Sequence, residues 1–307
     1  STRPGPMNVA VSDKQLTSLL GNETLARLER LRLQPNRRKT NRTQGEHAAG
    51  KGGSSTEFAD YRNYVPGDDV RFVDWNIFAR LNRPFMKLYQ YEEVMHVAIL
   101  VDGSNSMNFE GKFERACQLA AALGLTALMG VERISAYVVG ASGEPPTVMP
   151  PCSGRVSMRR LFDFFERAEC GGDATIDSAV ESMLRRHRGK GLAIIVSDFL
   201  TPASLARPFN LLYSAGMEIF ALQVLGPTEI DPDLTGDLRL VDSEHGRTVD
   251  VSSIGELHGI YREHRERLEE HVRRQCRIRN GRFLSISSDA PLDWVLFDLL
   301  QRQGWLK

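Results

Sequence analysis

The chain contains the stretch His96-Val-Ala-Ile-Leu-Val-Asp102-Gly-Ser104-Asn-Ser106-Met107. An apolar run of strand length ends here in an aspartate, and two serines follow at alternate positions. A second run has the same form, Leu192-Ala-Ile-Ile-Val-Ser-Asp198. Nearly continuous apolar runs are typical of parallel strands that are covered on both faces. The two stretches therefore predict buried strands that end in Asp102 and Asp198.

Strand and helix patterns alternate between residues 96 and 226. We expect strands at Val97–Val101, Ile134–Val139, Leu192–Val196 and Ile219–Leu225. A largely buried helix is expected between the first two strands, and further helices at Ser157–Arg167, Ile176–Arg186 and Ala203–Tyr213. This order favours right-handed crossovers and predicts an α/β fold with a doubly wound, mostly parallel sheet of the Rossmann type.

The pattern changes after residue 227. Residues 238–241 and 248–251 resemble a hairpin, and a long charged helix is expected over about Ile254 to Arg279. A strand at Phe283–Ser287 and a final helix near Pro291–Gln303 complete this C-terminal addition.

The first 95 residues differ in composition from the rest. Residues 13–33 have a helical period that Gly21-Asn22 divides into two short helices, and a basic, Gly/Ser-rich linker follows. Residues 57–93 contain a turn at Pro66-Gly67-Asp68 and then a short helix capped by Asp68 or Asp69. We therefore divide the chain into an N-terminal helical segment with linker (1–45), a β-containing extension packed on the core (46–95) and the main domain (96–307). No second domain able to fold alone is expected.

Composition makes several classes of protein less favoured for this chain. The chain has 307 residues, 41% of them hydrophobic, and its 39 basic residues balance its 39 acidic residues. Net neutrality disfavours nucleic-acid binding, for which Arg37–Arg42 is the remaining candidate. No apolar run approaches the ~20 residues that span a bilayer. The four cysteines form no C-x-x-C pair, so free thiols in the cytoplasm are favoured over a disulfide or a zinc site.

Several oxygen-bearing side chains are expected at one edge of the sheet. In an open α/β sheet, ligands bind beyond the carboxyl ends of the strands. Asp102 and Asp198 lie there, and Thr175 opens a later helix; the candidate metal ligands are Asp102, Ser104, Ser106, Thr175 and Asp198. This donor set suits Mg²⁺, with Mn²⁺ or Ca²⁺ as alternatives. Because the hydroxyls add no charge, a bound ion could still take an external anion, most naturally a carboxylate from another protein.

Other interpretations of these residues remain open. Asp102 and Ser104 could simply cap a helix. Asp173 and Asp177 compete with Thr175 as ligands in their loop. A Mg²⁺-dependent phosphohydrolase with Asp102 as nucleophile is the main functional alternative. Position 104 lacks the second aspartate of such enzymes, and no lysine is evident at a matching motif.

The pattern Asp102-x-Ser104-x-Ser106 with Thr175 and Asp198 resembles the metal-ion-dependent adhesion site of the von Willebrand factor A fold. The run from Glu57 to Arg80 resembles the signature of one bacterial and archaeal family within that fold, known as domain of unknown function 58. The matching positions are Arg62, Tyr64, Gly67, Asp68, Arg71, Asp74, Trp75, Ala79 and Arg80. The resemblance extends from about residue 40 to the C-terminus.

The resemblance implies a von Willebrand factor A-like domain in which all five candidate residues hold a metal. It also implies a non-enzymatic, metal-dependent adaptor, since family members are commonly encoded beside MoxR-type AAA+ ATPases and are thought to act with them in protein assembly or remodelling. The chain departs from the family where Ile176 follows the threonine in place of Asp or Asn. For the Arg62–Arg80 block we weigh structural ion pairs around a Trp75 anchor against a partner-binding face.

Overall fold

The computed structural model describes residues 15–35, 56–91, 95–130, 132–140, 144–173, 175–187, 190–200, 204–232, 238–241, 248–251 and 254–307. Contacts divide the chain into two compact units, one made of Ser1–Gln34 with His96–Lys307 and one of Pro35–Met95. The predicted boundary at residue 45 and the basic linker lie outside the described residues.

The larger unit is built on a six-stranded sheet with the order β10-β7-β6-β3-β4-β5. Its strands are β3 (His96–Asp102), β4 (Arg133–Val139), β5 (Thr147–Ser153), β6 (Gly191–Ser197), β7 (Met217–Leu225) and β10 (Arg282–Ser287). Every neighbouring pair is parallel except β4 with β5, which is antiparallel. The predicted α/β class and mostly parallel sheet are confirmed, while the edge strand β5 was not expected.

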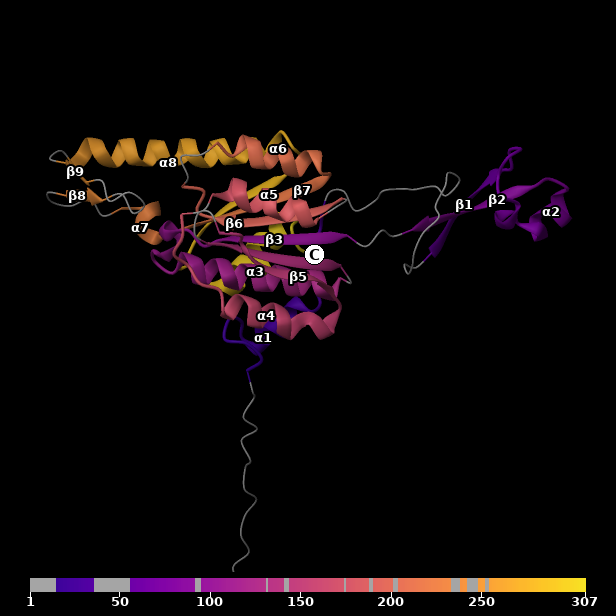
Figure 1. Cartoon of the computed structure of the whole chain (residues 1–307), viewed down its shortest axis with the longest axis horizontal. Helices are drawn as coiled ribbons and strands as arrows, with labels where there is room; N and C mark the ends of the chain where they lie inside the picture. The colour runs from indigo at the N-terminus through magenta and orange to yellow at the C-terminus, as the bar shows by residue number, and fades with distance from the viewer. Residues whose placement is uncertain are drawn as a thin grey trace, which may run out of the picture. The chain divides into compact units, whose positions relative to one another are not determined.

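Helices cover both faces of this sheet. They are α3 (Lys112–Met129), α4 (Met158–Glu166), α5 (Ile176–Arg186), α6 (Ala206–Ser214) and α8 (Ile254–Arg277). Figure 1 shows α5, α6 and α8 on one face of the sheet and α3 and α4 on the other. Helix α3 is buried along most of its length because its alanines and Gly124 allow close packing; a Cβ at Gly124 would lie 2.9 Å from Leu161 Cδ2.

The strand order reverses beside β3. From β3 the chain proceeds to β4 on one side, and after β5 it returns to β6 on the other side of β3. Strands β3 and β6 are direct parallel neighbours, with Val101 opposite Val196. A crevice beyond the strand ends forms at such a reversal. The residues that follow β3 and β6 therefore occupy the position where an α/β sheet binds ligands.

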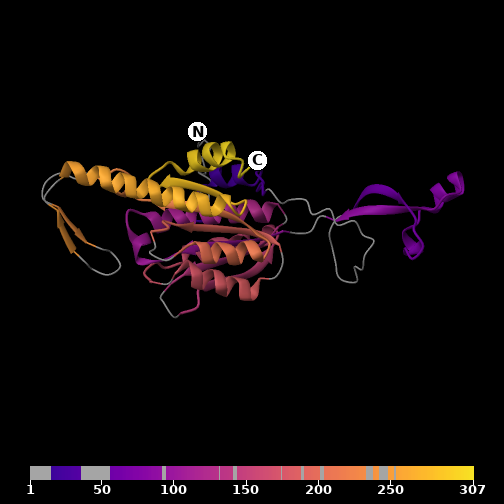
Figure 2. The same ribbon diagram turned by 90° about the horizontal axis from the view of Figure 1, so that it is seen from above.

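The N-terminal segment belongs to the larger unit and packs near the C-terminus. Within residues 15–35 it contains one helix, α1 (Asn22–Leu28), where two were expected over residues 13–33. Figure 2 shows this indigo segment beside the yellow C-terminal helices. Thr24 Oγ1 donates to Asp293 Oδ1 over 2.8 Å, and Leu33 forms a β-bridge with Leu306. The expected final helix is divided into α9 (Leu292–Trp294), a π-helical turn (Val295–Leu299) and α10 (Leu300–Arg302).

The insertion between β7 and β10 contains the expected hairpin and long helix, preceded by a short helix that was not expected. Short helix α7 (Pro227–Ile230) follows β7, and β8 (Leu238–Val241) pairs with β9 (Thr248–Val251) as an antiparallel hairpin before α8 begins. Tyr261 of α8 donates its hydroxyl to the carbonyl of Glu229 over 2.8 Å, which ties α8 to α7. Within the described ranges, no helix combines the length and apolar character needed to cross a membrane.

The smaller unit is an antiparallel pair, β1 (Thr56–Asn63) and β2 (Phe85–Tyr91), joined through two short helices. Asp69 caps a 3-10 turn at Val70–Phe72, as expected, and Asp74 caps α2 (Trp75–Leu81). Arg62 donates to both carboxylate oxygens of Asp68 over 2.6 and 2.7 Å, which lowers the pKa of Asp68 to about 2. Trp75 is 59% exposed, so it does not anchor this unit's interior.

Candidate functional site

Asp102 ends β3 and is held by two hydrogen bonds at the crevice. Its Oδ1 accepts from the Ser104 amide over 2.9 Å, and its Oδ2 accepts from Ser197 Oγ over 2.6 Å. Burial raises the pKa of the Asp102 carboxyl, the charge of Asp198 raises it further, and the hydrogen bonds oppose both effects. The two aspartates are therefore close enough to repel each other, as expected for neighbouring strand ends.

Ser104 and Ser106 lie side by side below the surface. Their hydroxyl oxygens are 3.1 Å apart, and both residues are buried. Ser104 occupies the N-cap position of a 3-10 turn (Asn105–Asn108), yet its side chain makes no capping hydrogen bond. Among the described residues the Ser104 hydroxyl therefore does not cap the turn, although the Asp102 carboxylate does accept the Ser104 amide.

The loop before α5 packs against the serine turn through its backbone. The amides of Gly171 and Gly172 donate to the carbonyl of Gly103 over 2.9 and 3.1 Å, and the Asn105 amide donates to the Gly172 carbonyl over 2.8 Å. The Cys170 thiol donates to the carbonyl of Ser104 over 3.1 Å. This loop is thus fixed against the turn that carries both serines.

Thr175 lies three residues beyond the part of the loop that contacts the turn. It is exposed at the N-cap of α5, and its side chain makes no capping hydrogen bond. Among the described residues, no hydrogen bond links its hydroxyl to Asp102, Ser104 or Ser106. The structure brings the Thr175 loop to the site, while within the described part of the chain the hydroxyl forms no hydrogen bond with the other candidate ligands.

Asp198 follows β6 and is bound by a lysine. Lys112 Nζ donates to Asp198 Oδ2 over 2.8 Å and to Glu229 Oε1 over 2.7 Å. Asp198 is 2% exposed and the Lys112 side chain is fully buried. The next residue, Phe199, has a φ of 53°, which is uncommon for a bulky side chain and marks local backbone strain. Asp198 is therefore held rigidly between a lysine and a strained turn.

The donors near Asp102 fit a small hard cation. Two oxygens in neighbouring octahedral positions about 2.1 Å from Mg²⁺ lie about 3 Å apart, and the two serine hydroxyls are 3.1 Å apart. Each Asp102 oxygen uses one lone pair in the bonds above, so one remains on each for a cation. Across the described residues, no three His, Cys, Asp or Glu side chains gather as a metal cluster, so any ion here would depend on hydroxyl ligands.

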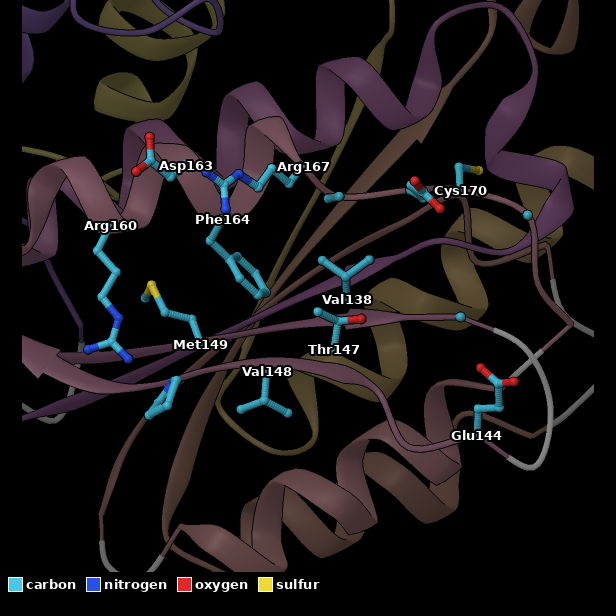
Figure 3. A pocket seen from close by; sticks show the side chains of 15 residues that line it. Val138, Glu144, Thr147, Val148, Met149, Arg160, Asp163, Phe164, Arg167 and Cys170 are labelled. Atoms are coloured by element: carbon cyan, nitrogen blue, oxygen red, sulfur yellow. The ribbon is translucent and has the colours of Figure 1, made fainter.

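A pocket of about 760 Å³ adjoins the loop that braces the site. Figure 3 shows Arg160 and Phe164 of α4, with Arg167 at the C-cap of that helix, on one side and Val148 and Met149 of β5 on another. Cys170, whose thiol contacts the Ser104 carbonyl, lines the same pocket. The loop that braces Ser104 is therefore also one wall of this cavity.

Three polar residues of the site were missed from the sequence. Ser197 directly precedes Asp198, and in the sequence it is indistinguishable from an ordinary residue of the strand. Lys112 starts a helix, where a lysine side chain is ordinarily exposed to solvent. Glu229 is 117 residues from Lys112 in the chain, and no local pattern links the two. No lysine is evident at a phosphohydrolase motif in the sequence, and the structure adds that Lys112 Nζ lies 2.8 Å from Asp198 Oδ2.

One family model and several uncharacterized relatives match this chain. The family model described as "Protein of unknown function DUF58" matches residues 60–276. Uncharacterized proteins of Mycobacterium tuberculosis and Mycobacterium bovis are 32% identical over 209 residues, covering 66% of this chain and 65% of each relative. The match thus spans slightly less than two thirds of these relatives' length.

Two solved structures are distantly similar. One is a conserved hypothetical protein BatB from Bacteroides thetaiotaomicron (16% identity, TM-score 0.42, 68% of this chain and 97% of that one). The other is an aerotolerance-related membrane protein from Bacteroides fragilis (15% identity, TM-score 0.41, 67% of this chain and 99% of that one). Since the matched family model covers residues 60–276, which is well over half of the sequence, the chain belongs to the DUF58 family of proteins of unknown function.

Proposed function

We propose that this chain is a non-enzymatic protein-binding module that depends on a divalent metal, Mg²⁺ first and Mn²⁺ or Ca²⁺ as alternatives. The observation that carries the proposal is the pair of serine hydroxyls, 3.1 Å apart and directly after Asp102, which serve no capping function. The proposed ligand set is Asp102, Ser104 and Ser106, with Thr175 and Asp198 completing the von Willebrand factor A-like adhesion site.

The bound ion would supply an electrophilic position that an outside carboxylate can occupy. The chain's own residues define that position. Ser197 and the Ser104 amide orient Asp102, and the Gly171–Gly172 backbone fixes the serine turn. Because these groups are already hydrogen-bonded in place, little ordering is needed when a partner binds.

We propose an acidic side chain of a MoxR-type AAA+ ATPase, or of its client, as the partner. Family resemblance supports the ATPase, and the oxygen-only donor set supports an acidic ligand. All four cysteines are free thiols, which agrees with a reducing compartment, and we therefore place the module in the cytoplasm.

Affinity capture with and without a chelator tests this proposal. We expect purified MoxR-type ATPase from the same source to be retained by the wild type in Mg²⁺ and released by EDTA. Ser104→Ala/Ser106→Ala should abolish retention with the fold intact, because the two hydroxyls bond to each other and are removed together. Ser153→Ala/Ser157→Ala, which deletes one hydroxyl at the end of β5 and one in the 3-10 turn that follows it, is the matched control. Retention that is unchanged by EDTA and by the Ser104/Ser106 substitutions would contradict the proposal.

A Mg²⁺-dependent phosphohydrolase is the second candidate, and Lys112 is the observation that favours it. Its buried ammonium supplies a cation near the two aspartates. Against this, Lys112 bonds Asp198 and Glu229, and position 104 carries a hydroxyl where an acid/base carboxylate would be needed. If the wild type hydrolyses p-nitrophenyl phosphate and Asp102→Asn does not, the phosphohydrolase is favoured. If the wild type does not hydrolyse this substrate, the binding module is favoured.

A further inference from the structure

Lys112 is a buried charge in an unfavourable position. Its side chain has no exposed surface, and it is the first residue of α3, where the helix dipole opposes a positive charge. Burying an ammonium is costly unless carboxylates compensate it. Asp198 and Glu229 both do so, at 2.8 and 2.7 Å.

The two carboxylates differ in what else they bind. Asp198 adjoins the crevice, where its charge acts on Asp102. Glu229 lies in α7, where its Oε2 accepts from the Gly226 amide over 2.7 Å. The Lys112 ammonium therefore bridges the crevice to a carboxylate that is fixed outside it.

A divalent ion at Asp102, Ser104 and Ser106 would compete with this ammonium. Both cations are attracted to Asp198, and they repel each other at short range in a poorly solvated interior. An ammonium that stays bonded to Asp198 withdraws one of the crevice's two carboxylates from the ion. Glu229 offers the ammonium another partner without requiring Lys112 to leave its buried position.

We propose that Lys112 is a positioning residue that acts as a tethered competitor of the metal. Its ammonium neutralises Asp198 when the site is empty and shifts toward Glu229 when a divalent ion binds. Metal affinity is then set by the lysine as well as by the ligands, and the ion binds weakly until a partner's carboxylate adds charge to the site. This inference rests on the proposed function, because it requires a metal at Asp102, Ser104 and Ser106.

Mn²⁺ titration of the purified full chain, followed by the EPR signal of the free ion, tests the proposal. Lys112→Met keeps a long side chain and removes the charge, and it should bind Mn²⁺ at least about tenfold more tightly than the wild type. Lys112→Arg, which keeps the charge, should not gain affinity. Lys87→Met, which removes a lysine paired with Asp74 in the smaller unit, is the matched control and should leave affinity unchanged.

The double variant Lys112→Met/Glu229→Gln separates competition from a general change in charge. It removes one positive and one negative charge, so the net charge of the cluster stays the same. Loss of a competitor still predicts tighter binding than in the wild type. Affinity equal to or weaker than the wild type's in this variant overturns the proposal. The double variant also guards against misfolding of Lys112→Met, since it leaves one fewer buried carboxylate unpaired.

The outcomes distinguish this inference from the proposed function. If the wild type and Lys112→Met bind Mn²⁺ equally, and Ser104→Ala abolishes binding in both, the metal site stands and the role of Lys112 is refuted. If neither binds Mn²⁺, the metal site itself fails, and the inference fails with it. Binding by Lys112→Met that is far stronger than by the wild type supports both.

Discussion

Ser197 Oγ donates to Asp102 Oδ2 over 2.6 Å and so joins the carboxyl ends of β6 and β3. The same oxygen accepts from the Phe199 amide over 2.8 Å, at the residue whose backbone is strained. Ser197 is fully buried. One hydroxyl therefore fixes both the aspartate of the first strand and the turn that carries the aspartate of the second.

Ser197→Ala should lower the free energy of unfolding by about 1–3 kcal/mol, because a buried carboxylate and a buried amide each lose a partner. Urea denaturation followed by circular dichroism measures the change. Ser157→Ala removes an exposed hydroxyl and should change the free energy of unfolding by no more than about 0.5 kcal/mol. Equal stability of the two variants would show that the hydroxyl does not fix these strand ends.

Gly103→Ala should disturb the serine turn by steric clash. A Cβ at this position would lie 2.3 Å from the Val139 carbonyl oxygen and 3.3 Å from that of Glu169. Because both neighbours are backbone, we expect a loss of about 1–3 kcal/mol in the free energy of unfolding. Gly140→Ala is the control, since nothing lies within 4 Å of its added Cβ. A stable Gly103→Ala protein in urea denaturation would mean that the loop is less closely packed than described.

The histidine pair at the opposite end of β3 predicts a loss of stability in acid. His96 and His187 place their Nδ1 atoms 2.6 Å apart, and His96 Nε2 contacts Ser135 Oγ at 2.9 Å. Burial, together with the charges of His187 and Arg133, lowers the pKa of His96 from 6.5 to about 4. The folded chain thus keeps His96 neutral at pH values where the unfolded chain protonates it. The contribution of neutral His96 to the free energy of unfolding is complete above pH 6.5 and is lost as the pH falls from 6.5 toward 4.

When the pH falls from 7.5 to 5.0, we expect the free energy of unfolding of the wild type to decrease by about 1–2 kcal/mol more than that of His96→Gln. This value is discounted for the partial exposure of His96. Urea denaturation at the two pH values measures this difference. His264→Gln, at an exposed position on α8, is the control and should follow the wild type. Equal decreases in the free energy of unfolding in all three proteins would show that His96 is not the cause of the loss of stability in acid.

The fold could be predicted because its central strands carry strong local signals. The runs that became β3, β4, β6 and β7 are apolar along nearly their whole length, and helices separate them. Strand β5 was missed because Pro150 and Pro151 interrupt it, and prolines are tolerated only at a sheet edge, which is where β5 lies. The C-terminal helix pattern was visible, while its π-helical interruption at Val295–Leu299 has no local signature.

The site could be predicted only where its residues follow the strands directly. The structure has strands β3 and β6 ending where the sequence predicted, and four candidate residues lie at or directly after these ends: Asp102, Ser104, Ser106 and Asp198. The contacts of Lys112 depend on helix α7, which is far away in the chain, and so could not be read from a local pattern. The exposure of Thr175 likewise depends on how its loop meets Gly103, which is a tertiary contact.

The measurement that tests the central claim most directly is Mn²⁺ binding by the wild type and by Ser104→Ala/Ser106→Ala. We expect one site per chain in the wild type, competed by Mg²⁺, and an affinity at least about tenfold weaker in the double variant. Ser153→Ala/Ser157→Ala should bind as the wild type does. Equal Mn²⁺ affinity in all three proteins, or no binding by any of them, would contradict a metal site built on Asp102, Ser104 and Ser106.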